Sequence, residues 1–183
     1  MEINRTPRVA PLPLTQTGQS VVEAYDEHTS RYRNRITNMK ATLGHSLVAF
    51  HAYMEWYPLY EEVKKVLGER LSPLFAWSIS EAADCPLCST YFRKIIIESG
   101  ESPEQLSLSR EEQEVLTFGA AIAGNKGFVN DPEFEPIARR FSDKEIVILT
   151  AFAGIMVATN IFNNVLHTGI DEYLQVYKKP SLI

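Results

Sequence analysis

Apolar residues recur at intervals of three and four along most of the chain, which is the spacing of one face of an α-helix. The clearest stretch is residues 38–56, where one face would carry Leu43, Leu47, Phe50 and Met54. No alternation of apolar and polar residues, as in a β-strand, continues for more than a few positions. The pattern predicts an all-α fold.

Capping and breaking residues divide this pattern into separate helices. Two serine–glutamate pairs have the spacing of a capping box at a helix start: Ser109–Glu112 and Ser142–Glu145. Pro58 and Gly68 mark helix ends, and a Gly-, Asn-, Asp- and Pro-rich loop is expected over 124–132. The expected helices span residues 20–32, 38–56, 59–67, 72–83, 86–99, 109–123, 142–166 and 170–177.

Two parts are expected along the chain. Residues 1–18 contain three of the ten prolines and form an extended N-terminal arm, whose apolar residues can lie against the body or a neighbouring subunit. Residues 19–183 form a single helical domain, because 183 residues with 45% apolar content suit one well-buried core. Residues 72–79 and 142–149 are loosely similar, which suggests an internal helical repeat.

Charge and hydropathy exclude several classes of partner. The chain carries 18 basic and 23 acidic residues, a formal net charge of −5, and no basic stripe. Nucleic acid and membranes are therefore not expected partners. The most apolar run, residues 146–157, predicts a buried helix. The first residues have no apolar signal-peptide segment, so we expect the protein in the cytoplasm.

The two cysteines of the chain stand in one motif, Cys85-Pro86-Leu87-Cys88. A disulfide between them would close too short a loop to stabilise the fold much, so the spacing favours a reversible two-electron redox pair. Asp84 is a plausible N-cap and proline suits a first helical turn. A thiol in that turn meets free N–H groups and the positive end of the helix dipole, which lower its pKa.

Two other interpretations of the motif are weaker. Cysteines often pack as small apolar groups. A closed zinc site needs four ligands, and the four histidines are scattered: His28, His45, His51 and His167. No metal or other cofactor is therefore expected. A thioredoxin-like fold is not expected either, because no pattern of parallel strands surrounds the motif.

The chain resembles the AhpD-like alkylhydroperoxidase branch of the carboxymuconolactone decarboxylase family. The resemblance covers about residues 5–178, and its carriers are Arg5-Thr6-Pro7, the helices before Cys85-Pro86-Leu87-Cys88, and residues 158–164. It implies an AhpD-like helical bundle that forms a homo-oligomer (dimer, trimer or hexamer). It also implies an antioxidant peroxidase whose dithiol reduces a small peroxide or disulfide and is regenerated by a thiol reductant protein. In that family the second cysteine attacks and the first resolves, which assigns attack to Cys88 and resolution to Cys85.

The chain departs from the family pattern at its proton relay. A histidine usually follows the second cysteine by four residues, and here that residue is Phe92. The relay glutamate usually lies about three turns before the first cysteine, where this chain has residues 71–74. Glu81 is one replacement, because its spacing would stack it with both cysteines on a continuous helix. The others are His51 and His45, reaching the dithiol from a neighbouring helix. All three also have ordinary explanations as solvated or packed side chains.

The sequence therefore predicts a thiol-dependent oxidoreductase, peroxidase-like or disulfide reductase-like. Two alternatives stay open: a non-redox enzyme of the decarboxylase type, and a non-enzymatic redox sensor. The two thiols should differ. The helix start favours Cys85 as the thiol of lower pKa, whereas the resemblance favours Cys88 as the attacker. We prefer Cys88, because the charge of Asp84 opposes ionisation of the thiol next to it.

Overall fold

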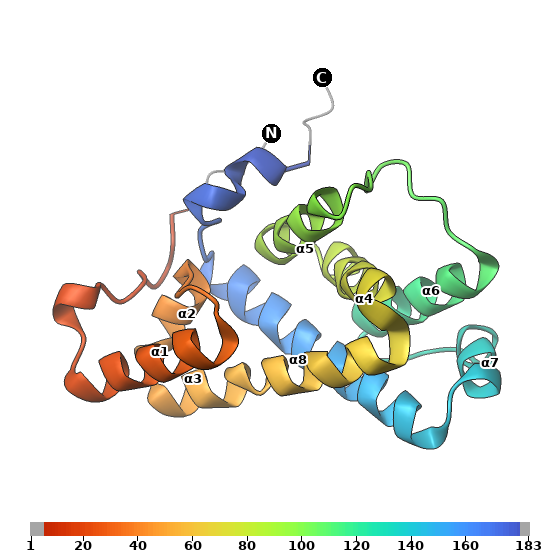
Figure 1. The fold of residues 1–183 in the computed structure, drawn as a ribbon, viewed down its shortest axis with the longest axis horizontal. Coiled ribbons are helices and arrows are strands. Elements are labelled where there is room, and N and C mark those ends of the chain that lie inside the picture. Colours follow the sequence, from red (N-terminus) through yellow and green to blue (C-terminus); the bar gives the residue numbers. More distant parts are fainter. Residues whose placement is uncertain (1–5, 180–183) are drawn as a thin grey trace.

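The computed structural model describes residues 6–179, and residues 1–5 and 180–183 of the predicted arm and domain lie outside the described residues. The described residues contain no strand, which confirms the all-α prediction (Figure 1). The elements are 3-10 helix η1 (Leu14–Gln16), α1 (Gln19–Tyr32), α2 (Asn38–Leu43), α3 (Leu47–Met54), α4 (Trp56–Ala82), α5 (Pro86–Glu98), α6 (Arg110–Gly124), α7 (Asp131–Arg140), α8 (Asp143–Leu166) and η2 (Glu172–Tyr177).

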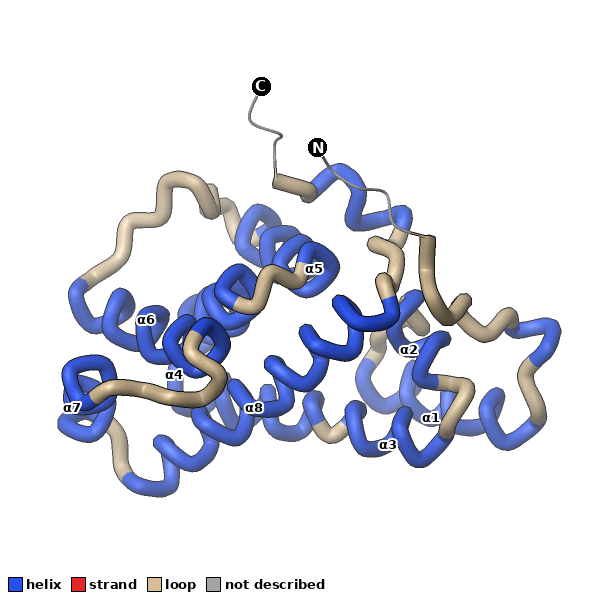
Figure 2. Tube along the Cα trace, turned by 180° about the vertical axis from the view of Figure 1, so that it is seen from behind, coloured by secondary structure: helices blue, strands red, loops and turns tan. Residues whose placement is uncertain are grey.

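Helix α4 is the centre of the arrangement. It packs against α5, α6 and α8, and α8 crosses between the α1–α3 side and the α6–α7 side of the molecule (Figures 1 and 2). A smaller cluster joins α1, α2 and α3 around Tyr25, Leu43 and Phe50. The main core lies where α4, α6 and α8 meet. The site described below forms where these two sides approach each other.

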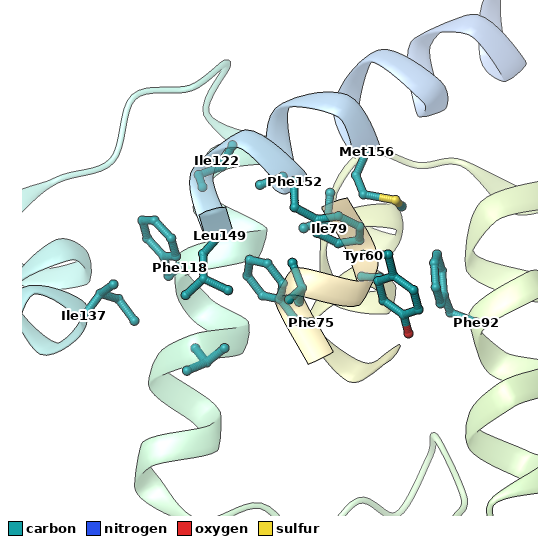
Figure 3. Packing of buried hydrophobic residues seen from close by; sticks show 14 residues of the cluster. Tyr60, Phe75, Ile79, Phe92, Phe118, Ile122, Ile137, Leu149, Phe152 and Met156 are labelled. Carbon is teal, nitrogen blue, oxygen red and sulfur yellow. The ribbon is translucent and has the colours of Figure 1, made fainter. Parts of the chain in front are cut away.

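The main core is a row of large side chains. In Figure 3 the row runs from Ile137 and Phe118 at one end to Tyr60 and Phe92 at the other. Phe152 of α8 lies inside the row, with ring centroids 6.2 Å from Phe75 and 5.4 Å from Tyr60. Burial of aromatic rings of this size supplies much of the free energy that holds helices together.

The predicted long helix over residues 38–56 is wrong, because the segment folds as α2 and α3. Ser46 has an extended backbone and caps α3, with its side chain accepting a hydrogen bond from the Ala49 N–H at 3.3 Å. Gly44 ends α2, where the Tyr25 hydroxyl lies so close that a Cβ on Gly44 would be 1.8 Å from it. The glycine is required by this close approach.

The break predicted at Gly68 is confirmed, because its φ of 78° is outside the helical range, and the helices expected over 59–67 and 72–83 are the parts of α4 on either side of it. One further element differs from the prediction. The segment after 130 contains α7, which was not predicted. Asn130 and Glu133 form its capping box, and a proline stands in its first turn. The capping boxes predicted for α6 and α8 are confirmed.

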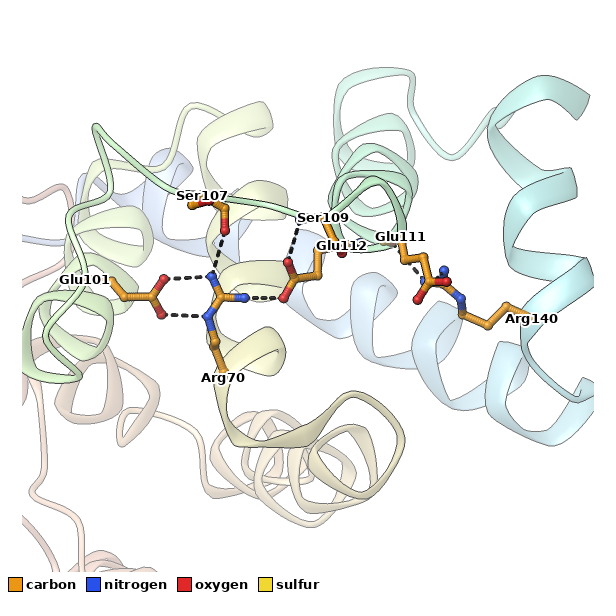
Figure 4. Close-up of polar contacts among 7 residues, drawn as sticks. All are labelled: Arg70, Glu101, Ser107, Ser109, Glu111, Glu112 and Arg140. Atoms are coloured by element: carbon orange, nitrogen blue, oxygen red, sulfur yellow. Dashed lines mark hydrogen bonds and ion pairs between the residues drawn. The ribbon is translucent and has the colours of Figure 1, made fainter.

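Ion pairs tie the connection between α5 and α6 to α4. Arg70 of α4 binds both carboxylate oxygens of Glu101, at 2.8 and 2.9 Å, and also contacts Glu112 and the Ser107 carbonyl (Figure 4). A bidentate arginine–carboxylate pair within a network is more effective than an isolated surface pair. The network holds the long α5–α6 loop.

The N-terminal arm lies against the body, one of the two placements expected. The Arg8 N–H donates to the Leu166 carbonyl at 2.8 Å, and the Leu12 N–H donates to the Ala41 carbonyl at 3.1 Å. The arm therefore links α8 to α2.

Helix α8 is apolar on two faces. One face enters the core through Leu149, Phe152 and Met156, whereas Val147, Ile161 and Val165 are exposed, among the residues that the structure describes. By length and composition α8 could cross a membrane, with a mean hydropathy of 1.9 and 33% of its most apolar window buried. The core contacts support the interpretation as a core helix with one uncovered face. The predicted homo-oligomer and internal repeat stay predictions.

His28 is a buried histidine without a hydrogen-bond partner among the described residues. It is 3% exposed, and its ring packs against Tyr32, Phe50 and Tyr57 at centroid distances of 4.9 to 5.7 Å. Burial, together with the nearby Lys40 ammonium, lowers the pKa of His28 from 6.5 to about 4. The neutral ring is therefore the form that the fold accommodates.

This histidine should make the fold acid-sensitive. Because its pKa is lower in the folded state, its contribution to stability is complete above pH 6.5 and is lost as pH falls from 6.5 to about 4. The loss is about 2–3 kcal/mol in the free energy of unfolding. Urea unfolding of His28→Phe should show a smaller drop over this range. The exposed His51→Asn should behave as wild type, and an unchanged drop in His28→Phe would contradict the assignment.

Gly119 of α6 should be intolerant of a side chain. A Cβ there would lie 2.6 Å from Phe75 Cε2 and 3.1 Å from Ile79 Cγ1, whereas one on Gly124 of the same helix would meet nothing within 4 Å. Gly119→Ala should lower the free energy of unfolding by about 1–3 kcal/mol through overpacking. Gly124→Ala is the matched control and should leave it unchanged or raise it by up to about 1 kcal/mol. Thermal unfolding of both variants measures the difference.

Candidate active site

The dithiol lies at the break between α4 and α5. Asp84 has φ 48°, a left-handed conformation that turns the chain between the two helices. Cys85 then has an extended backbone and is the N-cap of α5, so the prediction of Asp84 as the cap is wrong. The Cys85 sulfur accepts a hydrogen bond from the Cys88 N–H at 3.4 Å, and Pro86 stands in the first turn as expected. The thiol replaces the usual capping oxygen.

Both cysteines are buried and reduced, with exposed fractions of 1% for Cys85 and 5% for Cys88. The Cys88 thiol, the backbone N–H groups of Cys88 and Leu87, and the Asn163 amide all hydrogen-bond to the Cys85 sulfur, and they lower its pKa against the opposing effect of burial. Burial and the hydrogen bond and charge of Cys85 raise the pKa of Cys88 well above its ordinary value. Cys85 is therefore the thiol of lower pKa in the pair.

The expectation that Asp84 gives Cys88 the lower pKa is therefore wrong, whereas attack by Cys88 stays a prediction. It depended on the charge of Asp84, but that side chain is exposed to solvent, and the hydrogen bonds of the helix start act on Cys85. Exposure to solvent screens the charge of Asp84, whereas the N–H groups and the Cys88 thiol touch the sulfur directly.

Asn163 of α8 holds the pair from the other side. Its Nδ2 donates to Cys88 Sγ at 3.3 Å, and its Oδ1 is buried without a hydrogen-bond partner among the described residues. The next amide, Asn164, donates to the Ala83 carbonyl at 3.1 Å and joins α8 to the end of α4. These contacts position the dithiol against α8.

Cys88 faces a cavity of about 100 Å³ with mainly apolar walls. Helices α2, α3, α4, α5 and α8 and the segment after α8 line it. Its lining residues are Asn34, Thr37, Met39, Lys40, Tyr53, Met54, Trp56, Tyr57, Leu87, Cys88, Tyr91, Phe92, Met156, Thr159, Asp171, Tyr173 and Leu174. Cys85 is not among them, so a molecule in the cavity would meet Cys88 first.

The three replacements predicted for the proton relay do not line this cavity. Glu81 lies before the break in the helix, which removes the predicted alignment, and it pairs with Lys179 at 3.3 Å. His45 is exposed, with Nε2 at 3.0 Å from the Ala10 carbonyl, and His51 is exposed on α3. Phe92, at the usual histidine position, is 2% exposed and lines the cavity as an apolar ring.

Besides Cys88, the titratable groups that line the cavity are Lys40, Asp171 and four tyrosines, and neither Lys40 nor Asp171 was predicted from the sequence. One signal was present for Lys40: it stands three residues before Leu43 and seven before Leu47, in register with the apolar face of the predicted helix. A lysine on the apolar face of a helix is expected to be buried, which is rare for a charged side chain. Asp171 has no such signal, because tertiary packing alone brings it there.

The comparisons with known proteins bear on the fold. No protein-family model and no curated protein matches the chain. Among solved structures, a cysteine-to-alanine variant of the debrominase Bmp8 in complex with 2,3,4-tribromopyrrole is similar, with a TM-score of 0.75, 17% identity and coverage of 92% of this chain and 94% of that chain.

Two further solved structures are similar over nearly the whole chain, and one of them is named as an AhpD core. The alkylhydroperoxidase AhpD core protein of Ralstonia eutropha JMP134 has a TM-score of 0.64 and 14% identity, covering 97% of this chain and 100% of that chain. The chain has the AhpD-like fold. An uncharacterised peroxidase-related protein of Silicibacter sp. TM1040 has a TM-score of 0.62 and 16% identity, covering 92% of this chain and 91% of that chain. The fold expected from the resemblance is confirmed.

The two unequal thiols can be titrated separately. In Cys88→Ser the serine hydroxyl can still donate to Cys85, so the remaining thiol should ionise below its ordinary pKa. In Cys85→Ser the remaining Cys88 is buried, so it should ionise at least about one pH unit higher than the thiol of the first variant. The ultraviolet absorbance of the thiolate against pH measures both, and the reverse order would contradict the assignment.

Proposed function

We propose that the protein is a thiol-dependent oxidoreductase whose Cys85–Cys88 dithiol reduces a small organic molecule bound in the aromatic cavity. The observation that carries the proposal is the placement of Cys88 on the cavity wall with its thiol hydrogen-bonded to Cys85. The Cys88 thiol meets the substrate, and the Cys85 thiol is already in contact with Cys88 to complete a disulfide. An inert packing role would not need a cavity at one of the sulfurs.

With an organic hydroperoxide the reaction has two steps. Cys88 gives up its proton to the Cys85 thiolate and attacks the terminal peroxide oxygen, which breaks the O–O bond and leaves Cys88 as a sulfenic acid; the departing alkoxide takes the proton from Cys85 and leaves as an alcohol. The Cys85 thiolate then attacks the Cys88 sulfur and forms the disulfide, and the displaced hydroxide takes a proton from solvent to become water. The peroxide gains two electrons and the dithiol loses two. A thiol donor must reduce the disulfide again, which is the role of the predicted reductant protein.

Reductive debromination is the second candidate, favoured by the similarity to the debrominase Bmp8 and by the cavity walls of Trp56, Tyr57 and Tyr91. The overall reaction replaces a carbon–bromine bond by carbon–hydrogen, releases bromide and a proton, and oxidises the dithiol to the same disulfide. Because flat aromatic walls suit a ring better than an alkyl hydroperoxide, this candidate explains the shape of the cavity more fully.

Thiol titration tests the proposal. One equivalent of tert-butyl hydroperoxide or of 2,3,4-tribromopyrrole should consume both thiols per chain, with release of bromide in the second case. Cys88→Ser should abolish the reaction. Cys85→Ser should consume one thiol and stop at the sulfenic acid, because no resolving thiol remains. Thiol counts, with mass spectrometry of the product, report each outcome.

The rate distinguishes the candidates. Phe92 cannot transfer a proton, so peroxide turnover should be about 10²–10⁴-fold slower than with a relay histidine. Consumption of thiols without turnover in the presence of a reductant would support the redox sensor. Intact thiols with both substrates would contradict the proposal and favour the non-redox enzyme.

A further inference from the structure

Lys40 is a buried cation at the cavity that the dithiol chemistry does not use. Lys40 is 5% exposed. Its Nζ donates a hydrogen bond to the Arg35 carbonyl at 2.7 Å and lies 5.1 Å from the centroid of the Tyr57 ring. Among residues 6–179 no carboxylate forms an ion pair with it, although Asp171 is near enough for an electrostatic effect. A lysine has three N–H donors, and one is used.

Asp171 lines the same cavity, and only one of its two carboxylate oxygens has a hydrogen-bond partner among the described residues. Its Oδ1 accepts from the Asn38 N–H at 2.9 Å, whereas its Oδ2 is buried with no hydrogen-bond partner among the described residues. The neighbouring polar groups have partners: Asn34 Nδ2 donates to the Tyr57 hydroxyl at 3.0 Å, and Thr37 caps α2. Lys40 and Asp171 therefore bring unused donors and an unused acceptor, of opposite charge, to the same cavity.

Burial destabilises the charged forms of both Lys40 and Asp171. Burial lowers the pKa of Lys40 to about 7 against the effect of Asp171, and burial raises the pKa of Asp171 against the effects of Lys40 and Arg35. The other titratable groups close to them are His28, Tyr57 and Tyr173. A buried polar atom without a partner typically costs about 1–3 kcal/mol. A ligand that offers an acceptor to Lys40 and a donor to Asp171 removes both penalties.

We propose that Lys40 Nζ and Asp171 Oδ2 bind the hydroxyl group of a small aromatic ring, a phenol. The hydroxyl oxygen accepts from Lys40, and its hydrogen is donated to Asp171. The ring lies against Trp56, Tyr57 and Tyr91. The cavity of about 100 Å³ is smaller than an engineered cavity of about 150 Å³ that holds benzene, so it limits the ligand to a single small ring.

This inference names the substrate class of the proposed oxidoreductase and rests on that function for the reaction at Cys88, but the binding step needs no thiol. The ring would lie in the cavity that Cys88 also lines, so the polar group would orient it for attack. Two oriented hydrogen bonds to buried groups also exclude rings that lack the donor, because those leave Asp171 unpaired.

The test compares 4-bromophenol with 4-bromoanisole, in which a methyl group replaces the hydroxyl hydrogen. Isothermal titration calorimetry with the wild-type chain should give at least about tenfold tighter binding of the phenol. Asp171→Asn keeps an acceptor for the Asn38 N–H but removes Oδ2, so it should bring the two affinities to within about twofold. Lys40→Met should weaken phenol binding about tenfold, whereas Lys144→Met, on the exposed start of α8, should bind as wild type.

Three results would overturn the inference: equal affinity of the wild-type chain for both probes, no binding of either probe, or a preference for the phenol that survives in Asp171→Asn. The wild-type comparison needs no variant to fold. Cys88→Ser should keep the full preference for the phenol. A preference that persists in a protein whose thiols do not react would contradict the proposed function alone, and reactive thiols without the preference would contradict this inference alone.

Discussion

The site depends on the hydrogen bond between the Cys88 thiol and the Cys85 sulfur. It lowers the pKa of Cys85 and raises the pKa of Cys88 at the cavity wall. The bond exists where Asp84 turns the chain in a left-handed conformation, which ends α4 and makes Cys85 the N-cap of α5. In a continuous helix Cys85 would not be an N-cap, and its sulfur would not accept the free N–H groups of a helix start. The break between helices is therefore the feature that gives the motif its chemistry.

The rest of the fold holds this break in place. Helix α4 is fixed in the core by Phe75 and Ile79, shortly before the turn, and α8 reaches over the turn with Asn163 on Cys88 and Asn164 on Ala83. The core is filled with interlocked rings, whereas the adjoining cavity keeps open space beside the sulfur. The cavity also holds buried titratable groups that reduce stability, which is common at functional sites.

The sequence was most informative where a local rule decides the structure. Capping boxes at Ser109 and Ser142 placed the starts of α6 and α8 within a residue, because a cap needs only the residues beside it. Helix 38–56 failed because the apolar spacing continues through Gly44–Ser46, while the chain bends there to let Tyr25 approach. α7 was missed although the Asn130–Glu133 capping box was readable.

The sequence by itself determined the all-α class, the redox-competent spacing of the cysteines and the absence of the usual histidine at Phe92. These follow from neighbours along the chain. The tertiary structure alone decided that Cys85 has the lower pKa of the two thiols, that Cys88 faces a cavity, and that Glu81, His45 and His51 lie outside it. It also placed Asp171 near Lys40, which is 131 residues away along the chain. Burial, screening and hydrogen-bond partners set these properties, and each depends on residues far apart in sequence.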